Sequence, residues 1–369
     1  MPNIWPDPQP TPPPVKPSKA PRGDNLPVSA IIVVSTRSLL DEACDEGSLA
    51  DPPVNPRTAT PIASLKILGQ SILQRTIDRL HSAGVRTISV VSEGGVDQSF
   101  MLGALLKQAS KGFKKVLLIR LGAYVEVDYV ELLKFHYEAG ATVTRICDAD
   151  GPLDFWVLNP TPVLGREINL DTPAEVGGDQ PLLYLTTGYV NRLEDARSLR
   201  RLAKDSLLGR CAMRPRGEEI ERGVWVDVGA RIHRSATILA PAYIGRGTRV
   251  RASASINRFS AIEECCLVDH GAVIEHSSIL PDTYIGKGIA VAHAVVDGNR
   301  LMHLRSDISV TVEDAKIIGR APSGWHSFRY GDKKAERVQP APKVVGLEQV
   351  AYKPSPQRPA LRIFSKGEV

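Results

Sequence analysis

A six-residue repeat in the second half of the chain restricts its fold more than any other feature. From Val226 to Ile274 every sixth residue is Ile or Val, and a small residue follows each of them four positions later. The spacing shortens to five at Ile279 and returns to six at Ile285 and Val291. A helix cannot use this pattern, because six is not a multiple of 3.6 and the apolar stripe would rotate around the helix.

The repeat is typical of a triangular solenoid in which each hexad forms one short face. The branched side chain fills the interior, the small residue lies near a corner, and stacked coils pair their backbones edge to edge. We therefore predict a hexapeptide left-handed parallel β-helix over residues 224–298, an exception to the usual right-handed crossover. Residues 299–320 are predicted to form its cap. Cys265 and Cys266 fall inside the repeat, where they are interpreted as packing residues.

Residues 29–223 alternate strand and helix patterns, which indicates a parallel sheet covered by helices, a Rossmann-like α/β domain. The predicted strands are Ser29–Ser35, Thr87–Val91, Lys115–Leu121 and Thr142–Cys147. The predicted helices are Ser71–Ala83, a segment around Phe100–Ala109, Asp128–Ala139 and Leu193–Leu208. Ser71 and Asp128 are expected as N-caps, and Gly84, Gly140 and Gly209 as helix ends.

The two ends of the chain are rich in proline and polar residues. Residues 1–28 contain ten prolines and are expected to be a disordered arm, and residues 321–369 a basic, Pro-rich tail. Both are interpreted as linkers, with a peptide-docking or anchoring role as the alternative. The chain's net charge is +5, and the tail alone carries +5, so the body is close to neutral. A nucleic-acid-binding protein concentrates basic charge on a folded face, so no nucleic-acid partner is expected.

No apolar run is long enough to span a bilayer, and residues 1–10 lack the apolar core of a signal peptide. The five cysteines form no CxxC pair and no metal-ligand spacing, so neither a zinc site nor a disulfide scaffold is predicted. The expectation is a soluble cytoplasmic protein without a membrane partner.

Two segments and the domain order resemble sugar-1-phosphate nucleotidyltransferases of the GDP-mannose pyrophosphorylase type. Pro61–Leu73 (PIASLKILGQSIL) is similar to the family's PKxLLPVxGKPIL segment, and Val116–Thr144, with LLKFHYEAGATVT, to the segment that follows its metal-binding aspartate. The resemblance covers residues 29–296. It implies a GT-A-like domain followed by the β-helix, with a role in sugar-nucleotide and polysaccharide metabolism. Active members transfer NMP from an NTP to a sugar 1-phosphate with Mg²⁺.

The catalytic motifs of that family are degenerate here. Of its G-x-G-T-R loop only Thr36-Arg37 remains, its phosphate-neutralising lysine aligns with Ile62, and its Mg²⁺-binding aspartate aligns with Ala123. Alanine cannot ligate a hard cation, and one lost preorganised group typically costs ~10²–10³ in rate. The resemblance therefore implies a degenerate catalytic site and no confident metal site.

A bound nucleotide-sugar is expected over the carboxyl ends of the strands, near Thr36, Arg37, Gly69 and Gly122. Replacement ligands for Mg²⁺, if the protein is active, would be Glu126, Asp128 and Asp227, and replacement cations Lys66 or Arg57. The alternative interpretation makes Asp128 a helix N-cap, Asp227 a coil-corner residue, and Lys66 and Arg57 solvated surface charges.

Three functions are compatible with these observations. The first is a regulatory or scaffolding subunit that assembles with itself or with an active homologue. The second is an active, divergent nucleotidyltransferase, similar to a mannose-1-phosphate guanylyltransferase. The third is a CoA-dependent acyltransferase, because many hexapeptide β-helices carry that activity with a histidine base; His270, His276 and His293 are its candidates.

Overall fold

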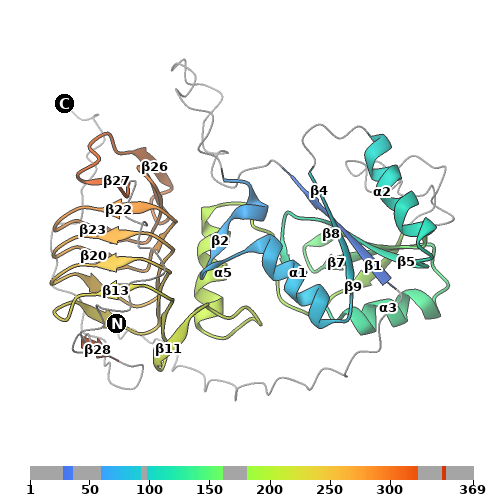
Figure 1. Ribbon diagram of the computed structural model, residues 1–369, viewed down its shortest axis with the longest axis horizontal. Helices are drawn as coiled ribbons and strands as arrows, with labels where there is room; N and C mark the ends of the chain where they lie inside the picture. The colour runs from blue at the N-terminus through green and yellow to red at the C-terminus, as the bar shows by residue number, and fades with distance from the viewer. Residues whose placement is uncertain (1–27, 36–59, 93–97, 161–180, 323–342, 346–369) are drawn as a thin grey trace, which may run out of the picture.

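The computed structural model describes residues 28–35, 60–92, 98–160, 181–322 and 343–345. A six-stranded sheet and a region of stacked three-sided coils lie at opposite ends of the molecule, with helix α5 between them (Figure 1). Within the described residues, no helix is both long and apolar enough to cross a membrane.

The N-terminal sheet has the strand order β4-β1-β5-β8-β7-β9. Its strands are β1 (Val28–Val34), β4 (Thr87–Ser92), β5 (Lys115–Arg120), β7 (Val143–Asp148), β8 (Gly151–Leu158) and β9 (Leu182–Leu185). Strands β4 and β5 flank β1 in parallel, as the buried apolar runs predicted. The predicted parallel sheet has one exception, β8, which runs antiparallel to β5 and β7 because only two residues separate it from β7.

Helices cover both faces of this sheet. They are α1 (Ile72–Ser82), α2 (Gln98–Ser110), α3 (Tyr129–Glu138) and α5 (Ala196–Leu207), close to their predicted positions. Leu80 of α1, Leu132 of α3 and Leu202 of α5 share one core with alternate residues of β1 and β5. Leu105 of α2 packs on the opposite face, against Trp156. Two short pairs complete this part, β2 (Lys66–Ile67) with β3 (Gln70–Ser71), and β6 (Tyr124–Val125) with β10 (Val190–Asn191).

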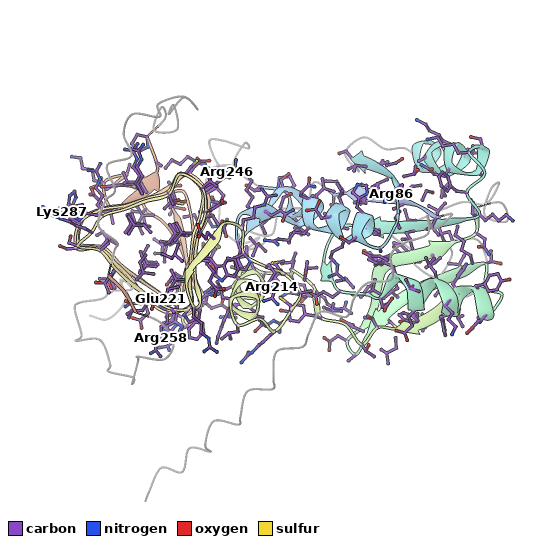
Figure 2. All side chains as sticks on the ribbon, turned by 60° about the horizontal axis from the view of Figure 1, so that its bottom comes forward. Arg86, Arg214, Glu221, Arg246, Arg258 and Lys287 are labelled. Carbon is purple, nitrogen blue, oxygen red and sulfur yellow. The ribbon has the colours of Figure 1, made fainter. Side chains whose placement is uncertain are left out.

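Residues 224–297, called the coil region below, pass in rotation through three sheets. The strands are β12 (Val224–Val226), β13 (Arg231–Ile232), β14 (Thr237–Leu239), β15 (Ala242–Ile244), β16 (Arg249–Val250), β17 (Ser255–Ile256), β18 (Ser260–Ile262), β19 (Leu267–Val268), β20 (Val273–Glu275), β21 (Ser278–Ile279), β22 (Thr283–Ile285), β23 (Ala290–Ala292) and β24 (Ala294–Asp297). Each strand from β12 to β21 pairs in parallel with the strand one turn later. Figure 2 shows Arg246, Arg258 and Lys287 at three corners of this region, with side chains filling its interior.

The interior of the coil region follows the predicted repeat. Ile238, Ile256 and Ile274 are fully buried in one column, and the small residues Ala236, Ala254 and Ala272 are buried beside them. The turn length is 18 residues in the first coils, as in Ala242 to Ser260, and 17 in later ones, as in Ser278 to Val295. The loss of one residue falls between Ile274 and Ile279, where the sequence spacing shortens to five.

Strands from outside the coil region cover both of its ends. At the late end, β25 (Arg300–His303) and β26 (Ile308–Thr311) extend the sheet of β24, and β27 (Ile318–Arg320) pairs with β22. At the early end, β11 (Glu218–Glu221) covers β12, and β28 (Lys343–Val345) pairs with β14. Three residues of the predicted tail, Lys343–Val345, therefore form a strand, while the rest of 323–369 and all of 1–27 lie outside the described residues.

Candidate ligand-binding site and domain junction

A cavity of about 250 Å³ lies at the carboxyl end of β5, where the chain turns toward β6. Its lining comes from α1, β5 and the loop after it, β6, the start of α3, β8 and the loop after β10: Thr76, Ile119, Arg120, Leu121, Gly122, Ala123, Val125, Tyr129, Pro152, Leu153, Asp154, Phe155, Arg192 and Glu194. Open α/β sheets bind ligands at this edge, because the loops there are free to diverge while the strands hold them in place.

The floor of the cavity is backbone held in place by the sheet. The Leu121 N–H donates to the Val33 carbonyl at 2.8 Å, which ties the end of β5 to β1. A Cβ added at Gly122 would meet no atom within 4 Å, so this glycine leaves open space beside Ala123. The predicted residue Gly122 thus lines the cavity, whereas Thr36, Arg37 and Arg57 lie outside the described residues.

Charged side chains surround the cavity in pairs. Arg192 forms an ion pair with Asp148 and donates to the Gly151 carbonyl at 3.0 Å. Burial opposes ionisation of Asp148, but its hydrogen bonds and charge interaction with Arg192 outweigh burial and lower its pKa. Arg120 lies 4.0 Å from Asp154, which also pairs with Arg145 at 3.2 Å. Arg120 and Arg192 therefore line the cavity together with the carboxylates Asp154 and Glu194, and the lining is mixed polar and apolar.

Glu126 and Asp128 are engaged in structural hydrogen bonds. Glu126 accepts from the Tyr124 hydroxyl at 2.7 Å and from the Ala212 N–H at 2.6 Å. Asp128 caps α3, accepting from the N–H groups of Val130 and Glu131 at 2.9 and 3.1 Å, which confirms the N-cap interpretation. Neither set of contacts fits a carboxylate that holds Mg²⁺, and the described residues contain no group of three metal-ligating side chains.

Asp227 and Gly69 lie at the junction with the coil region. Asp227 accepts from the Val228 N–H at 2.7 Å at a coil corner, as the alternative interpretation expected. A Cβ built on Gly69 would lie 3.3 Å from the Asp227 carboxylate and 2.2 Å from the Tyr243 hydroxyl. Gly69 therefore serves close packing of the two parts of the chain, a role that the nucleotide-site prediction did not include.

Lys66 also belongs to this junction. Its ammonium group pairs with Glu264 of the coil region, so it is neither the solvated surface charge nor the replacement phosphate ligand considered from the sequence. Arg75 of α1 is buried nearby and donates to the Ile67 carbonyl at 2.7 Å and the Arg214 carbonyl at 3.0 Å. Together these contacts fix the β2–β3 hairpin against both α1 and the coil region.

The centre of the junction is a buried carboxylate that the sequence did not reveal. Glu263 is 2% exposed and accepts from the Leu68 N–H at 2.7 Å and the Gly69 N–H at 2.9 Å. Burial raises its pKa to about 7, against the opposing effect of those two hydrogen bonds and of the Arg75 charge. One feature of the sequence could have indicated this burial. Asp227, Gly245, Glu263 and Leu280 occupy the same position in successive turns, each directly after an inward aliphatic residue. A side chain at position 245 would collide with the backbone of Glu263, which shows that this position is closely packed.

Glu263 should give the protein a measurable pH dependence. Its pKa rises from 4.5 in the unfolded chain to about 7 in the folded one, so the folded state binds more protons between these values. The free energy of unfolding should therefore fall by up to about 3 kcal/mol as pH rises from 4.5 to 7, and then level off. Chemical denaturation from pH 4.5 to 8 measures this. Glu263→Gln should flatten the slope, and Glu138→Gln, which removes an exposed carboxylate of α3, should keep it; equal slopes in all three proteins would contradict the assignment.

The three candidate histidines lie on the coil region without forming one site. His270 contacts Asp269 at 2.6 Å, whereas His276 and His293 stack on each other at 4.9 Å between ring centroids, below Phe259. Burial and then neighbouring cations, Arg305 first, lower the pKa of His293 to about 4. A general base works best with a pKa near the operating pH, so this histidine is poorly suited to deprotonate an acyl acceptor.

Helix α5 docks beside these histidines. Buried Arg200 donates from Nε to the His276 carbonyl at 3.0 Å and from its terminal nitrogen to the Phe259 carbonyl. Lys204 lies 5.1 Å from the centroid of the Phe259 ring. Burial lowers the pKa of Arg200 to about 10. The ring stack is therefore part of the surface that holds the linking helix.

No protein-family model matches the chain, and no curated protein sequence matches it.

Proposed function

We propose that this protein is a catalytically degenerate member of the sugar-1-phosphate nucleotidyltransferase superfamily, acting as a regulatory or scaffolding subunit in sugar-nucleotide or polysaccharide metabolism. Residues 29–223 would be its GT-A-like domain and residues 224–298 its left-handed hexapeptide β-helix. The mixed α/β sheet and the parallel strands of the coil region support this assignment. The interpretation places the protein in the reducing cytoplasm, consistent with free Cys147, Cys211, Cys265 and Cys266.

The observation that carries the proposal is the composition of the cavity edge. Gly122 and Ala123 line it where the family resemblance implies a metal-binding aspartate, and the nearest carboxylate along the chain, Glu126, holds Tyr124 and Ala212 instead. The cavity nonetheless retains features that bind ligands: the guanidinium groups of Arg120 and Arg192, each also paired with a carboxylate, the half-buried backbone at Gly122, and the aromatic rings of Tyr129 and Phe155. This combination favours binding of a nucleotide-sugar over its synthesis.

A regulatory subunit must pass the effect of ligand binding to another subunit, and we propose that the coil region provides the surface for this contact. Homo-oligomerisation, or a complex with an active homologue, is the arrangement we propose. The active, divergent nucleotidyltransferase remains the second candidate, supported by the same cavity. The acyltransferase is less favoured, because His276 and His293 are committed to a ring stack beside α5.

The proposal predicts binding without turnover. A panel of nucleotide-sugars should raise the melting temperature of the full-length protein, and titration calorimetry should detect the same ligands. Arg120→Ala should weaken the best of them by about ten- to a hundredfold, since a charge-assisted contact to phosphate contributes about 1.5–3 kcal/mol. Lys134→Ala, which removes an exposed cation of α3, should leave binding unchanged.

Pyrophosphate release is the decisive counter-test. It is measured with Mg²⁺, each NTP and a panel of sugar 1-phosphates. Turnover that disappears when Mg²⁺ is removed would establish the active enzyme instead. If the protein shows no turnover and binds none of these ligands, only the scaffolding role would remain.

A further inference from the structure

The early end of the coil region has a strand edge that the solenoid itself does not cover. Each inner strand of a parallel stack pairs on both sides, but the first-coil strand β14 has only β17 as a neighbour within the coil region. Its other edge is occupied by β28, which comes from the far end of the sequence. Exposed strand edges are sites where further strands add, so the strand that occupies this edge determines whether another chain can pair with it.

The pairing of β28 continues the register of the coils. Lys343 pairs with Thr237, Val344 with Ile238 and Val345 with Leu239, all in parallel. The same columns continue through Ser255 and Ile256 one coil further on. Val344 therefore takes the register position of the fully buried isoleucine column, and Lys-Val-Val acts as one additional face of the solenoid. In the sequence, Pro342 and Gly346 flank this segment and limit the strand to three residues.

The chain is much longer than this docking requires. Strand β27 ends at Arg320 at the late end of the coil region, while β28 lies at the early end (Figure 1). Spacings of about 4.8 Å between β23, β20, β17, β14 and β28 amount to about 19 Å. The residues between Arg320 and Lys343 reach about 75 Å when fully extended. A covalent tether with this slack favours docking through a high local concentration while allowing release.

We propose that the first coil is a strand-docking site for a short extended segment in parallel orientation, and that its occupant is this chain's own segment Lys343–Val345. The docked segment acts as a reversible strap: it completes the early end of the solenoid and keeps the β14 edge from pairing with a strand of another molecule. A three-residue strand forms few ladder hydrogen bonds, so the strap opens at a lower cost than the coils unfold. This inference does not depend on the proposed function.

Hydrogen exchange of the full-length protein tests the strap. The variant Val344→Pro with Val345→Pro removes two N–H donors and disfavours pairing, whereas Val344→Thr with Val345→Thr keeps β-branched residues. Exchange of the Ile238 N–H should be at least about tenfold faster in the proline variant and unchanged in the threonine variant, because the Thr237 N–H on the same strand instead donates to the Ala254 carbonyl of the next coil. Residues 255–256, one coil further in, should exchange equally in all three proteins. Equal exchange at Ile238 in the wild type and the proline variant would overturn the proposal.

Two further measurements identify the occupant. A fluorescent peptide of residues 339–349 should bind the proline variant and not the wild type, with a scrambled peptide as control; binding to neither would overturn the site. Light scattering should give the same molar mass for both proteins. A wild-type oligomer that the proline variant lacks would show that the strand comes from a second copy, and would overturn the intramolecular strap.

Discussion

Replacing Ile256 with aspartate should unfold the coil region. Ile256 is fully buried in the column of Ile238 and Ile274, where no polar partner is available for a carboxylate. An unpaired buried charge and the lost apolar contacts together should cost about 4 kcal/mol or more. Far-ultraviolet circular dichroism during thermal melting should show the loss of the coil transition.

Asn257→Asp is the matched control for this variant. Asn257 is half-buried beside Ile256, and its side-chain oxygen accepts from the Ser255 hydroxyl at 2.8 Å, a bond that aspartate can keep. This variant should melt within about 1 kcal/mol of the wild type. If Ile256→Asp melted like Asn257→Asp, position 256 would not face the interior and the coil register would be wrong.

Replacing Gly69 with alanine should loosen the junction between the two parts of the chain. Gly69 has φ +85°, and an added Cβ would lie 2.2 Å from the Tyr243 hydroxyl. Both the left-handed backbone and the collision favour a shift of the β2–β3 hairpin, which would remove hydrogen bonds from Glu263. We expect a loss of about 2–4 kcal/mol and faster proteolysis between residues 60 and 71.

A second substitution separates the effect of the left-handed backbone at position 69 from the effect of the collision with Tyr243. Tyr243→Phe removes the hydroxyl that the new methyl group would meet, so combining it with Gly69→Ala should recover part of the lost stability in a double-mutant cycle. Gly103→Ala, on an exposed part of α2 with open space around it, should be neutral or slightly stabilising. No coupling between positions 69 and 243 would contradict the contact.

The sequence predicted those features whose cause lies within a short stretch of chain. Six-residue spacing alone identified the inward columns, because each aliphatic residue faces the interior whatever surrounds the solenoid. The caps at Ser71 and Asp128 were equally local, since each accepts a hydrogen bond from an N–H two or three residues later. Gly122 was placed at the cavity because it follows a buried parallel strand.

Features that depend on distant partners were missed. Glu263 has the pattern of any outward-facing polar residue, and its burial arises from Leu68, 195 positions earlier in the chain. Lys66 resembles a surface lysine for the same reason. The antiparallel β8 and the three-residue β28 are set by pairing partners, and three residues are too few to show a periodicity.

The change from 18-residue to 17-residue turns affects where helix α5 docks on the coil region. In a perfectly periodic stack every rung is equivalent, so a helix docking on its side would have several equal positions, each one rung apart. Arg200 and Lys204 of α5 contact Phe259 and His276, which lie one turn apart at the corner where the turn length changes from 18 to 17 residues. The change of turn length makes this corner different from the earlier corners of the stack, so the docking position of the helix differs from its neighbours toward the early end.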